Sequence, residues 1–253
     1  MDLKPSPERQ ILFDTLTKYF ENEYKIADRN TAAHSELGYS KEAWERMRDL
    51  GILESLIDPE LNGFGGTPLD ISAVFEALGR GLVVEPFLET GLVSTKILGK
   101  GNENQKKLVA DLLENIALPT FCHSENDTDY RKSYVKTKLV PDKEGNFLVT
   151  GKKVMIKNAS GASHLIITCR SSGDYADEKG ITIACIPSNR SGIDIKSFSS
   201  IDGGRVSDIH LENVAVLKTE IIGNDGKGFE IISEAIDLEY WQFAQRPWVL
   251  WKK

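Results

Sequence analysis

Apolar residues recur every three or four positions through the first third of the chain, and every second position through much of the middle third. The segment ERQILFDTLTKYFEN shows the first pattern, with apolar positions at Ile11, Leu12, Leu16, Tyr19 and Phe20. This spacing places them on one face of a helix. The pattern therefore predicts an amphipathic helix whose apolar face is buried.

Residues that begin and end helices indicate two more helices in this part of the chain. Ser40 can cap the start of one helix, and Gly51 can end it. Thr67, Pro68 and Asp70 supply a capping hydroxyl, a residue whose φ suits a first helical turn, and an acid favoured by the helix dipole. We expect a helix after each cap.

A further helix is expected after Asn102, which can form a capping pair with Gln105. The pair precedes QKKLVADLLEN, in which Leu108, Leu112 and Leu113 form an apolar stripe. The first third of the chain is therefore expected to be helical.

The middle third, from residue 118 to 216, consists of short β-branched runs separated by turns, such as FLVTGKKVMI, HLIITCR and ITIACIP. In VKTKLV, the residues Val135, Thr137 and Leu139 face one way and the lysines face the other. This alternation is typical of an antiparallel sheet with one solvated face. Because no helix long enough for parallel crossovers lies between the runs, we expect a barrel or sandwich.

Helical spacing returns in FEIISEAIDLEYWQFAQ, and Pro247 is predicted to end that helix. The predicted fold class is α+β. It comprises an N-terminal all-helical domain over residues 1–116, an antiparallel β-barrel domain over 117–217, and the start of a truncated C-terminal helical region over 218–253.

Composition narrows the range of functions. The chain has 253 residues, 40% of them hydrophobic, and a formal net charge of −7. An acidic chain of this kind is a poor match for nucleic acid, which needs clustered Lys and Arg. Apolar runs are too short for a membrane span, and the start MDLKPSPERQ lacks the apolar segment of a signal peptide. We expect a cytoplasmic protein.

The three cysteines, Cys122, Cys169 and Cys185, lie in apolar runs that resemble strands. Their spacing contains no CxxC pair that would indicate a metal site. We expect buried free thiols and no bound metal.

The stretch LGILESLIDPELNGFGGTPLDISAVFEALGRGLVVEPFLET resembles the acyl-CoA dehydrogenase family, in which a Pro-Glu-x-x-Gly-Gly-type loop precedes a helix ending in Glu-x-Leu-Gly-Arg. The segments GKKVMIKNAS and HLENVAVLKTEIIGNDGKGFE extend the resemblance to about residues 8–245. Within the family, VEPFLET, SENDTDYR and IDGGRVSDIHLENV are most similar to small subunits of heteromeric dehydrogenases of the pimeloyl-CoA and steroid type. Typical members continue into a C-terminal helical bundle that does not follow here.

The resemblance implies an α,β-dehydrogenation of an acyl-CoA thioester, in which a carboxylate removes the α-proton and hydride passes to FAD. It also implies electron-transferring flavoprotein as the redox partner. The chain would assemble either with itself or with a large acyl-CoA dehydrogenase subunit.

The family's flavin-binding turn has an unusual counterpart here. The pair Ser124–Glu125 matches the family's Thr-Glu, and Thr128–Asp129 matches its Ser-Asp. Between them the family's glycines are missing, and Asn126 and Asp127 stand in their place. Asn and Asp tolerate positive φ better than other residues do, but an added acid beside a diphosphate is unfavourable.

Four more residues match flavin-side positions of the family. Met155 and Lys157 occupy the places of its Trp-x-Thr, and Phe121 and His123 match positions beside the flavin ring. Lys157 could pair with a phosphate or be a solvated strand residue. His123 could donate a hydrogen bond to the flavin or fill a strand face.

Candidate residues for the CoA phosphates are Arg131, Lys132 and Arg205, because two flank the flavin turn and one lies in the IDGGR loop. The candidate base is Glu239, which matches a minority arrangement with the base on the first helix after the barrel. The Arg that follows this base in the family is replaced by Tyr240. Each of the four could instead be an ordinary surface residue.

Large apolar side chains are concentrated near the end of the chain: Trp241, Phe243, Trp248, Val249, Leu250 and Trp251. Such a patch is typical of an interface. Three functions therefore stay open: a flavoprotein dehydrogenase subunit, a noncatalytic partner subunit, and a truncated inactive paralogue.

Overall fold

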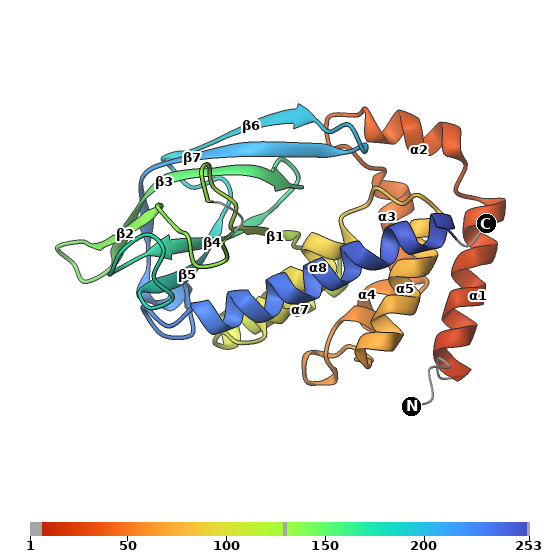
Figure 1. The fold of residues 1–253 in the computed structure, drawn as a ribbon, viewed down its shortest axis with the longest axis horizontal. Helices are drawn as coiled ribbons and strands as arrows, with labels where there is room; N and C mark the ends of the chain where they lie inside the picture. Colours follow the sequence, from red (N-terminus) through yellow and green to blue (C-terminus); the bar gives the residue numbers. More distant parts are fainter. Residues whose placement is uncertain (1–6, 129–130, 252–253) are drawn as a thin grey trace.

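A computed structural model describes residues 7–128 and 131–251, apart from the side chains of residues 8, 9 and 242–251. Its first part is helical, as the sequence predicts, and packs beside a sheet (Figure 1). The helices of this part are α1 (Pro7–Asn22), α2 (Ile26–Ala33), α3 (Lys41–Asp49), α4 (Ile52–Leu56), α5 (Pro68–Arg80), α6 (Ser94–Leu98) and α7 (Glu103–Leu113), with a 3₁₀ turn at Pro59–Leu61 and a π-helix at Phe87–Val93.

The predicted helix starts are confirmed by their caps. The Ser40 hydroxyl accepts a hydrogen bond from the Ala43 amide at 3.2 Å. Thr67 and Asp70 form a reciprocal capping box, and Asn102 forms another with Gln105. These caps satisfy amide groups that a helix leaves unpaired at its first turn.

Two aromatic side chains form the centre of the helical core. Trp44 stacks on Phe87 with ring centroids 4.5 Å apart, and its indole N–H donates to Asn115 Oδ1 at 3.1 Å. Leu16 of α1 is fully buried in the same core. Ile11, which was expected to share that face, is 67% exposed because the first turns of α1 extend beyond the core.

Over the described residues the sheet has eight strands: β1 (Pro119–Cys122), β2 (Lys138–Pro141), β3 (Phe147–Lys157), β4 (His164–Arg170), β5 (Ile181–Pro187), β6 (Ile193–Ser199), β7 (Arg205–Val216) and β8 (Ile221–Ile222). Their order is β6-β7-β3-β2-β4-β5-β8, and β1 pairs with β4. The pairing of β1 with β4 is parallel, as is one between β2 and β4. The sheet is therefore mixed, and the prediction of a purely antiparallel one is wrong in this detail. The reason is a long-range pairing: β1, entering from the helices, runs beside β4.

The sheet folds over so that β3, β7 and β6 lie above β4 and β5 (Figure 1). A second hydrophobic core fills the space between these layers. Val135, Thr137 and Leu139 point into the interior, which confirms the alternation read from VKTKLV. The cysteines are buried and unpaired, as predicted.

The last helix, α8 (Phe229–Trp251), crosses from the sheet to the helical part and lies against α5 (Figure 1). It continues through Pro247, so the predicted break there is wrong. Proline already has a helical φ, and its cost is one lost hydrogen bond and a clash with the preceding turn. Trp241 is 48% exposed and donates its indole N–H to Ser72 at 2.8 Å. The rest of the predicted apolar patch lies outside the described side chains.

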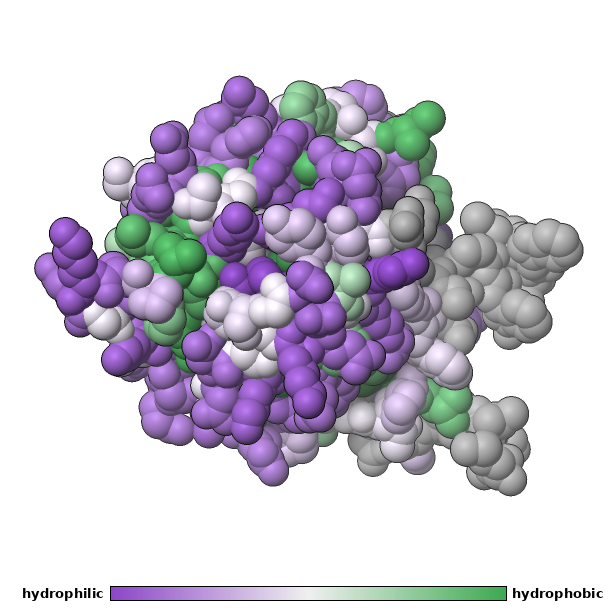
Figure 2. Space-filling model, turned by 60° about the vertical axis from the view of Figure 1, so that its left-hand side comes forward, coloured by the Kyte–Doolittle hydropathy of each residue, from purple (hydrophilic) through white to green (hydrophobic). Residues whose placement is uncertain are grey.

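The face of the molecule in Figure 2 is mainly hydrophilic, with small hydrophobic groups between charged ones. Among the described residues, no helix combines the length and apolar character needed to cross a bilayer.

We expect Trp44→Ala to lower the free energy of unfolding by about 3–5 kcal/mol, because it leaves a cavity beside Phe87 and an unpaired Asn115. Chemical denaturation followed by far-UV circular dichroism measures this change. Ile201→Ala is the matched control, since Ile201 is fully exposed, and should change stability by less than about 0.5 kcal/mol. Equal effects of the two substitutions would contradict this account of the core.

Candidate functional site

A cavity of about 260 Å³ opens where α8 crosses the end of β1. We call it the strand-end cavity. It brings together every predicted site residue except Arg205, namely Phe121, His123, Ser124, Thr128, Arg131, Lys132, Met155, Lys157 and Glu239. Residues far apart in the sequence therefore meet at one place, although their roles stay predictions.

Glu239 enters the strand-end cavity from α8. Burial raises the pKa of its carboxyl to about 7, and the neighbouring negative charge of Glu89 adds to this, while Lys157 opposes it. A carboxyl that titrates near neutral pH can take up a proton and release it under ordinary conditions. Such groups are concentrated at functional sites.

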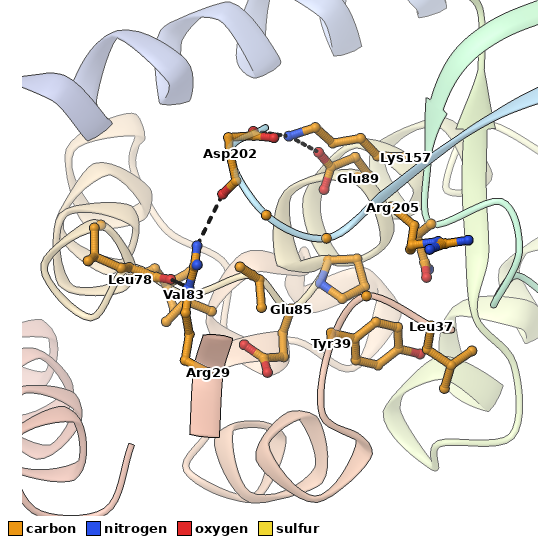
Figure 3. A pocket seen from close by; sticks show the side chains of 18 residues that line it. Arg29, Leu37, Tyr39, Leu78, Val83, Glu85, Glu89, Lys157, Asp202 and Arg205 are labelled. Carbon is orange, nitrogen blue, oxygen red and sulfur yellow. Dashed lines mark hydrogen bonds and ion pairs between the residues drawn. The ribbon is translucent and has the colours of Figure 1, made fainter. Parts of the chain in front are cut away.

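Lys157 lies at the boundary of two cavities and is paired with acids from both sides. Its Nζ is 3.9 Å from Glu89 Oε1 and 3.4 Å from Asp202 Oδ2 (Figure 3). It is therefore neither a purely solvated strand residue nor a cation free for a phosphate. Its charge offsets that of Glu89 beside Glu239.

Phe121 and His123 follow one another on the same side of β1 and its end, and their rings stack at 5.7 Å with nearly parallel planes. Opposite them, Met155 adopts a positive φ of 57° at a β-bulge between Lys153 and Ile156 and is 62% exposed. Bulges re-aim side chains next to binding sites. This one turns Met155 toward the strand-end cavity.

The turn after β1 confirms that an Asp can adopt the positive φ for which the family uses glycine. Asp127 has a φ of 59°, in the left-handed region that Asp tolerates. Its carboxylate is 86% exposed, lies 3.8 Å from Lys136 Nζ, and does not line the strand-end cavity. Asp129, predicted to match the family's Ser-Asp pair, lies outside the described residues.

The three predicted phosphate-binding residues are placed differently. Arg131 is exposed at the mouth of the strand-end cavity, with no side-chain partner among the described residues. Lys132 is bonded to Asp237 and lies 3.3 Å from Ser233 Oγ, so it ties the turn to α8. Arg205 lies instead in a neighbouring cavity of about 360 Å³ (Figure 3), because β7 starts on the far side of Lys157.

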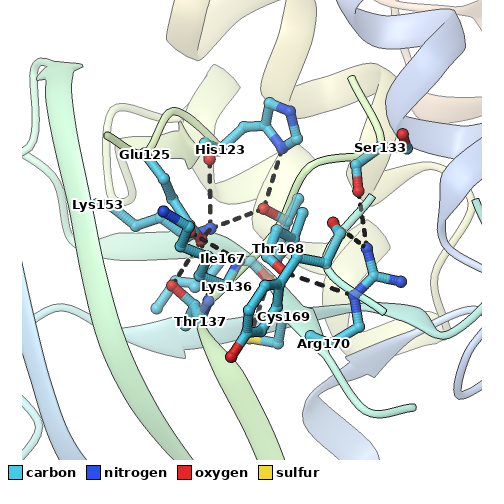
Figure 4. Close-up of polar contacts among 12 residues, drawn as sticks. His123, Glu125, Ser133, Lys136, Thr137, Lys153, Ile167, Thr168, Cys169 and Arg170 are labelled. Carbon is cyan, nitrogen blue, oxygen red and sulfur yellow. Dashed lines mark hydrogen bonds and ion pairs between the residues drawn. The ribbon is translucent and has the colours of Figure 1, made fainter. Parts of the chain in front are cut away.

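Behind the strand-end cavity lies a buried polar network that the sequence patterns did not predict (Figure 4). Lys153 Nζ donates to Glu125 Oε1 at 2.6 Å, and the two side chains are 0% and 3% exposed. Glu125 also accepts from the Thr137 hydroxyl at 2.7 Å and the Lys136 amide at 2.7 Å. Burial would raise the pKa of Glu125, but Lys153 and these hydrogen bonds outweigh it and lower the pKa.

The sequence holds signals for this network and for Glu89. Val149, Gly151 and Lys153 are spaced two apart along β3, and the first of these is a core residue. Alternation alone would have placed Lys153 inside. Glu89 is an acid within the apolar stretch VVEPFLETGLV, which indicates a charge close to the core. No cluster of metal-ligating side chains occurs among the described residues.

Comparison with known proteins identifies two matching family models. Residues 6–113 match "Acyl-CoA dehydrogenase, N-terminal domain", and residues 120–214 match "Acyl-CoA dehydrogenase, middle domain". The chain is 26% identical over 202 residues to a probable short/branched chain specific acyl-CoA dehydrogenase of Dictyostelium discoideum. That match covers 74% of this chain and 49% of the relative, so the chain spans about half of the relative's length.

Solved structures share the fold. Butyryl-CoA dehydrogenase of Megasphaera elsdenii superposes with a TM-score of 0.84 at 22% identity, over 97% of this chain and 66% of that one. The ChsE4-ChsE5 complex of Mycobacterium tuberculosis gives a TM-score of 0.83 at 16% identity, over 97% of this chain and 64% of that one. The likeness therefore extends beyond the family models into α8.

We expect Lys153→Met to lower the free energy of unfolding at pH 7 by about 3–5 kcal/mol, because it leaves the Glu125 carboxylate buried without its cation. Lys196→Met is the control, since the Lys196–Asp194 pair is about two-thirds exposed, and should cost less than about 1 kcal/mol. Urea denaturation at several pH values measures both changes.

The pH dependence tests the cause. Because the pKa of Glu125 is lowered on folding, its stabilisation is present above the unfolded carboxyl value of about 4.3 and is lost as pH falls through the folded value. The difference between wild type and Lys153→Met should therefore narrow in acid. A difference that stays constant down to pH 3 would show that the pair is not its source.

Proposed function

The chain belongs to the acyl-CoA dehydrogenase family, and from that premise we propose that it is a flavoprotein subunit which dehydrogenates an acyl-CoA thioester between its α and β carbons. The observation that carries the proposal is the strand-end cavity. It places a carboxyl that titrates near pH 7, Glu239, against the strand-end residues Phe121, His123 and Ser124.

The residues of the strand-end cavity fit the ring system of FAD. Its lining includes the apolar residues Val93, Phe121 and Ile236 and the hydroxyl-bearing residues Ser124 and Thr128. A flat ring with polar edges needs both. At about 260 Å³ the cavity is slightly smaller than the ~300 Å³ or more of typical ligand sites, which suits enclosure of one part of a long cofactor. Arg131, at the mouth of the strand-end cavity, would contact the negatively charged diphosphate part of FAD.

When bound, FAD would supply the hydride acceptor for this reaction. The chain's own part would be proton transfer: the Glu239 carboxylate would take a proton from the carbon next to the thioester carbonyl. Because the pKa of Glu239 is about 7, the carboxylate form is populated at neutral pH and binds a proton readily. Lys157 limits the repulsion between Glu89 and Glu239 and so keeps the pKa from rising further.

Assembly with further helices would complete the site. The chain spans about two-thirds of butyryl-CoA dehydrogenase and of the matched chain in the ChsE4-ChsE5 complex, which joins two different proteins. Tyr240 and Trp241 expose large apolar surface on α8 beside the strand-end cavity. A second copy or a large subunit would cover that surface, with an acyl-CoA as substrate and electron-transferring flavoprotein as electron acceptor.

One observation favours a second candidate function, a partner subunit that does not bind FAD itself. The strand-end cavity contains the acids Glu89 and Glu239, and its cations Lys132 and Lys157 are already paired. A diphosphate would therefore find only Arg131 without a partner among the described residues. A truncated, inactive paralogue would have the same features.

We expect the purified protein, alone or with its partner subunit, to bind FAD and to show flavin absorbance. Arg131→Gln should weaken FAD binding roughly 5- to 10-fold, in line with the loss of about 1 kcal/mol or more from one charge-assisted contact. Lys143→Gln removes the same charge from an exposed turn at the far end of the sheet and should leave binding unchanged. Titration followed by flavin fluorescence measures the affinities. A colourless protein that takes up no FAD in either form would favour the noncatalytic function.

Glu239→Gln should lower acyl-CoA dehydrogenation by about 10²- to 10⁴-fold, the usual contribution of a general base. Wild-type kcat/KM should rise with pH through an apparent pKa near 7, because only the carboxylate accepts the proton. Dye-coupled assays from pH 5.5 to 8.5 measure this profile. Glu230→Gln, on the exposed face of the same helix, is the control. Undiminished turnover by Glu239→Gln with flavin retained would exclude Glu239 as the base.

A further inference from the structure

His123 lies at the junction between the strand-end cavity and the buried network. Its Nδ1 is 3.0 Å from Thr168 Oγ1, and its ring stacks on Phe121. The other ring nitrogen, Nε2, points away from the network (Figure 4), and His123 lines the strand-end cavity. Which nitrogen carries the proton decides what this side chain presents to a ligand.

The proton's position follows from the donors around Thr168. A lysine ammonium has three N–H donors and no acceptor. Those of Lys153 are directed to Glu125 Oε1 at 2.6 Å, Thr168 Oγ1 at 2.9 Å and the His123 carbonyl at 3.2 Å. The Thr168 oxygen therefore accepts from Lys153, and its own O–H proton must go to a different group.

Among the described residues, the acceptor within reach of the Thr168 hydroxyl is His123 Nδ1. The opposite arrangement, with Nδ1–H donating to Thr168, would leave the hydroxyl proton of a fully buried residue without an acceptor. The cost of an unpaired buried donor favours the first arrangement by roughly 5- to 150-fold.

We propose that the Lys153–Thr168 relay fixes His123 as the tautomer protonated on Nε2, so that this N–H is a hydrogen-bond donor aimed into the strand-end cavity. Its ligand would carry an acceptor at that edge, a carbonyl oxygen or an unprotonated ring nitrogen. The identification of this ligand as the flavin rests on the proposed function. The assignment of the tautomer is independent of it. Thr168 and Lys153 are positioning residues in this scheme.

The same surroundings keep His123 uncharged. Burial and the positive charge of Lys153 lower its pKa to about 3, and Glu125 opposes this only in part. The other charged groups that line the cavity are Glu89, Arg131, Lys132, Lys157 and Glu239. Because it is neutral, His123 selects a ligand by the position of an acceptor atom and not by the ligand's charge. A ligand with a donor at that position would be rejected, because two N–H groups would then face each other.

Long-range ¹H–¹⁵N correlation spectra of the full chain with ¹⁵N-labelled histidine test the tautomer directly. The chain has four histidines, so His123→Gln assigns the signal by its loss. The expected spectrum shows an unprotonated Nδ1 and a protonated Nε2, without titration between pH 8 and 5. A proton on Nδ1, or titration near the ordinary histidine value of about 6.5, would overturn the proposal.

Substitutions at Thr168 test the relay. Thr168→Val keeps the shape but removes the hydroxyl, and should give a mixture of the two tautomers. Thr168→Ser restores the hydroxyl and should restore the single tautomer. An unchanged tautomer in Thr168→Val would overturn the role of Thr168. If that variant does not fold, the wild-type spectrum still decides between the two arrangements.

Addition of FAD to the labelled protein separates this inference from the proposed function. Binding seen by absorbance together with a shift of the His123 Nε2–H signal supports the donor role. Binding without any shift would overturn that role for the flavin. No binding at all would count against the proposed function, while the measured tautomer would still support or overturn the relay.

Discussion

The buried ion pair between Lys153 and Glu125 is the interaction on which the rest of the site depends. Desolvating two charges is expensive, and the pair is tolerated because each member has further hydrogen bonds. The Thr137 hydroxyl and the Lys136 amide donate to Glu125, and Lys153 donates to the Thr168 oxygen. Lys153 lies on β3 and Thr168 on β4, while Thr137 and the Lys136 amide lie just before β2. The pair therefore fixes the segment after β1 relative to β3 and β4. The turn that follows and the ring of His123 take their positions from it.

The helix α8 adds the second constraint. It closes the strand-end cavity and is held to the turn after β1 by the bond between Lys132 and Asp237. By excluding water, it raises the pKa of Glu239, and it also brings that carboxyl toward Glu89. Packing and acid–base chemistry are thus set by one element. A change that loosened α8 would hydrate Glu239 and return its pKa toward the ordinary carboxyl range.

Local patterns predicted the parts of this structure that depend on neighbours in the sequence. The capping box at Thr67 and the alternation in VKTKLV are of this kind. Features set by distant contacts were not predicted, such as the parallel pairing of β1 with β4. The predicted site residues at the end of β1 lie together because one strand end carries most of them. Arg205 lines the neighbouring cavity, and its predicted role stays a prediction. Lys153 was not predicted as buried because a lysine is almost never fully buried without a partner, and its partner Glu125 lies 28 residues away in the sequence.

The turn without glycines shows how a local substitution can keep a backbone path. A non-glycine residue in the left-handed region costs roughly 1–2 kcal/mol, less for Asp, whose short polar side chain is tolerated there. Asp127 accepts that conformation and directs its carboxylate to solvent beside Lys136, so water and salt screen its charge. Ser124 and Thr128, on either side of it, still face the strand-end cavity. The added acid therefore preserves the shape that glycine would allow and places little negative charge where an anionic ligand would bind.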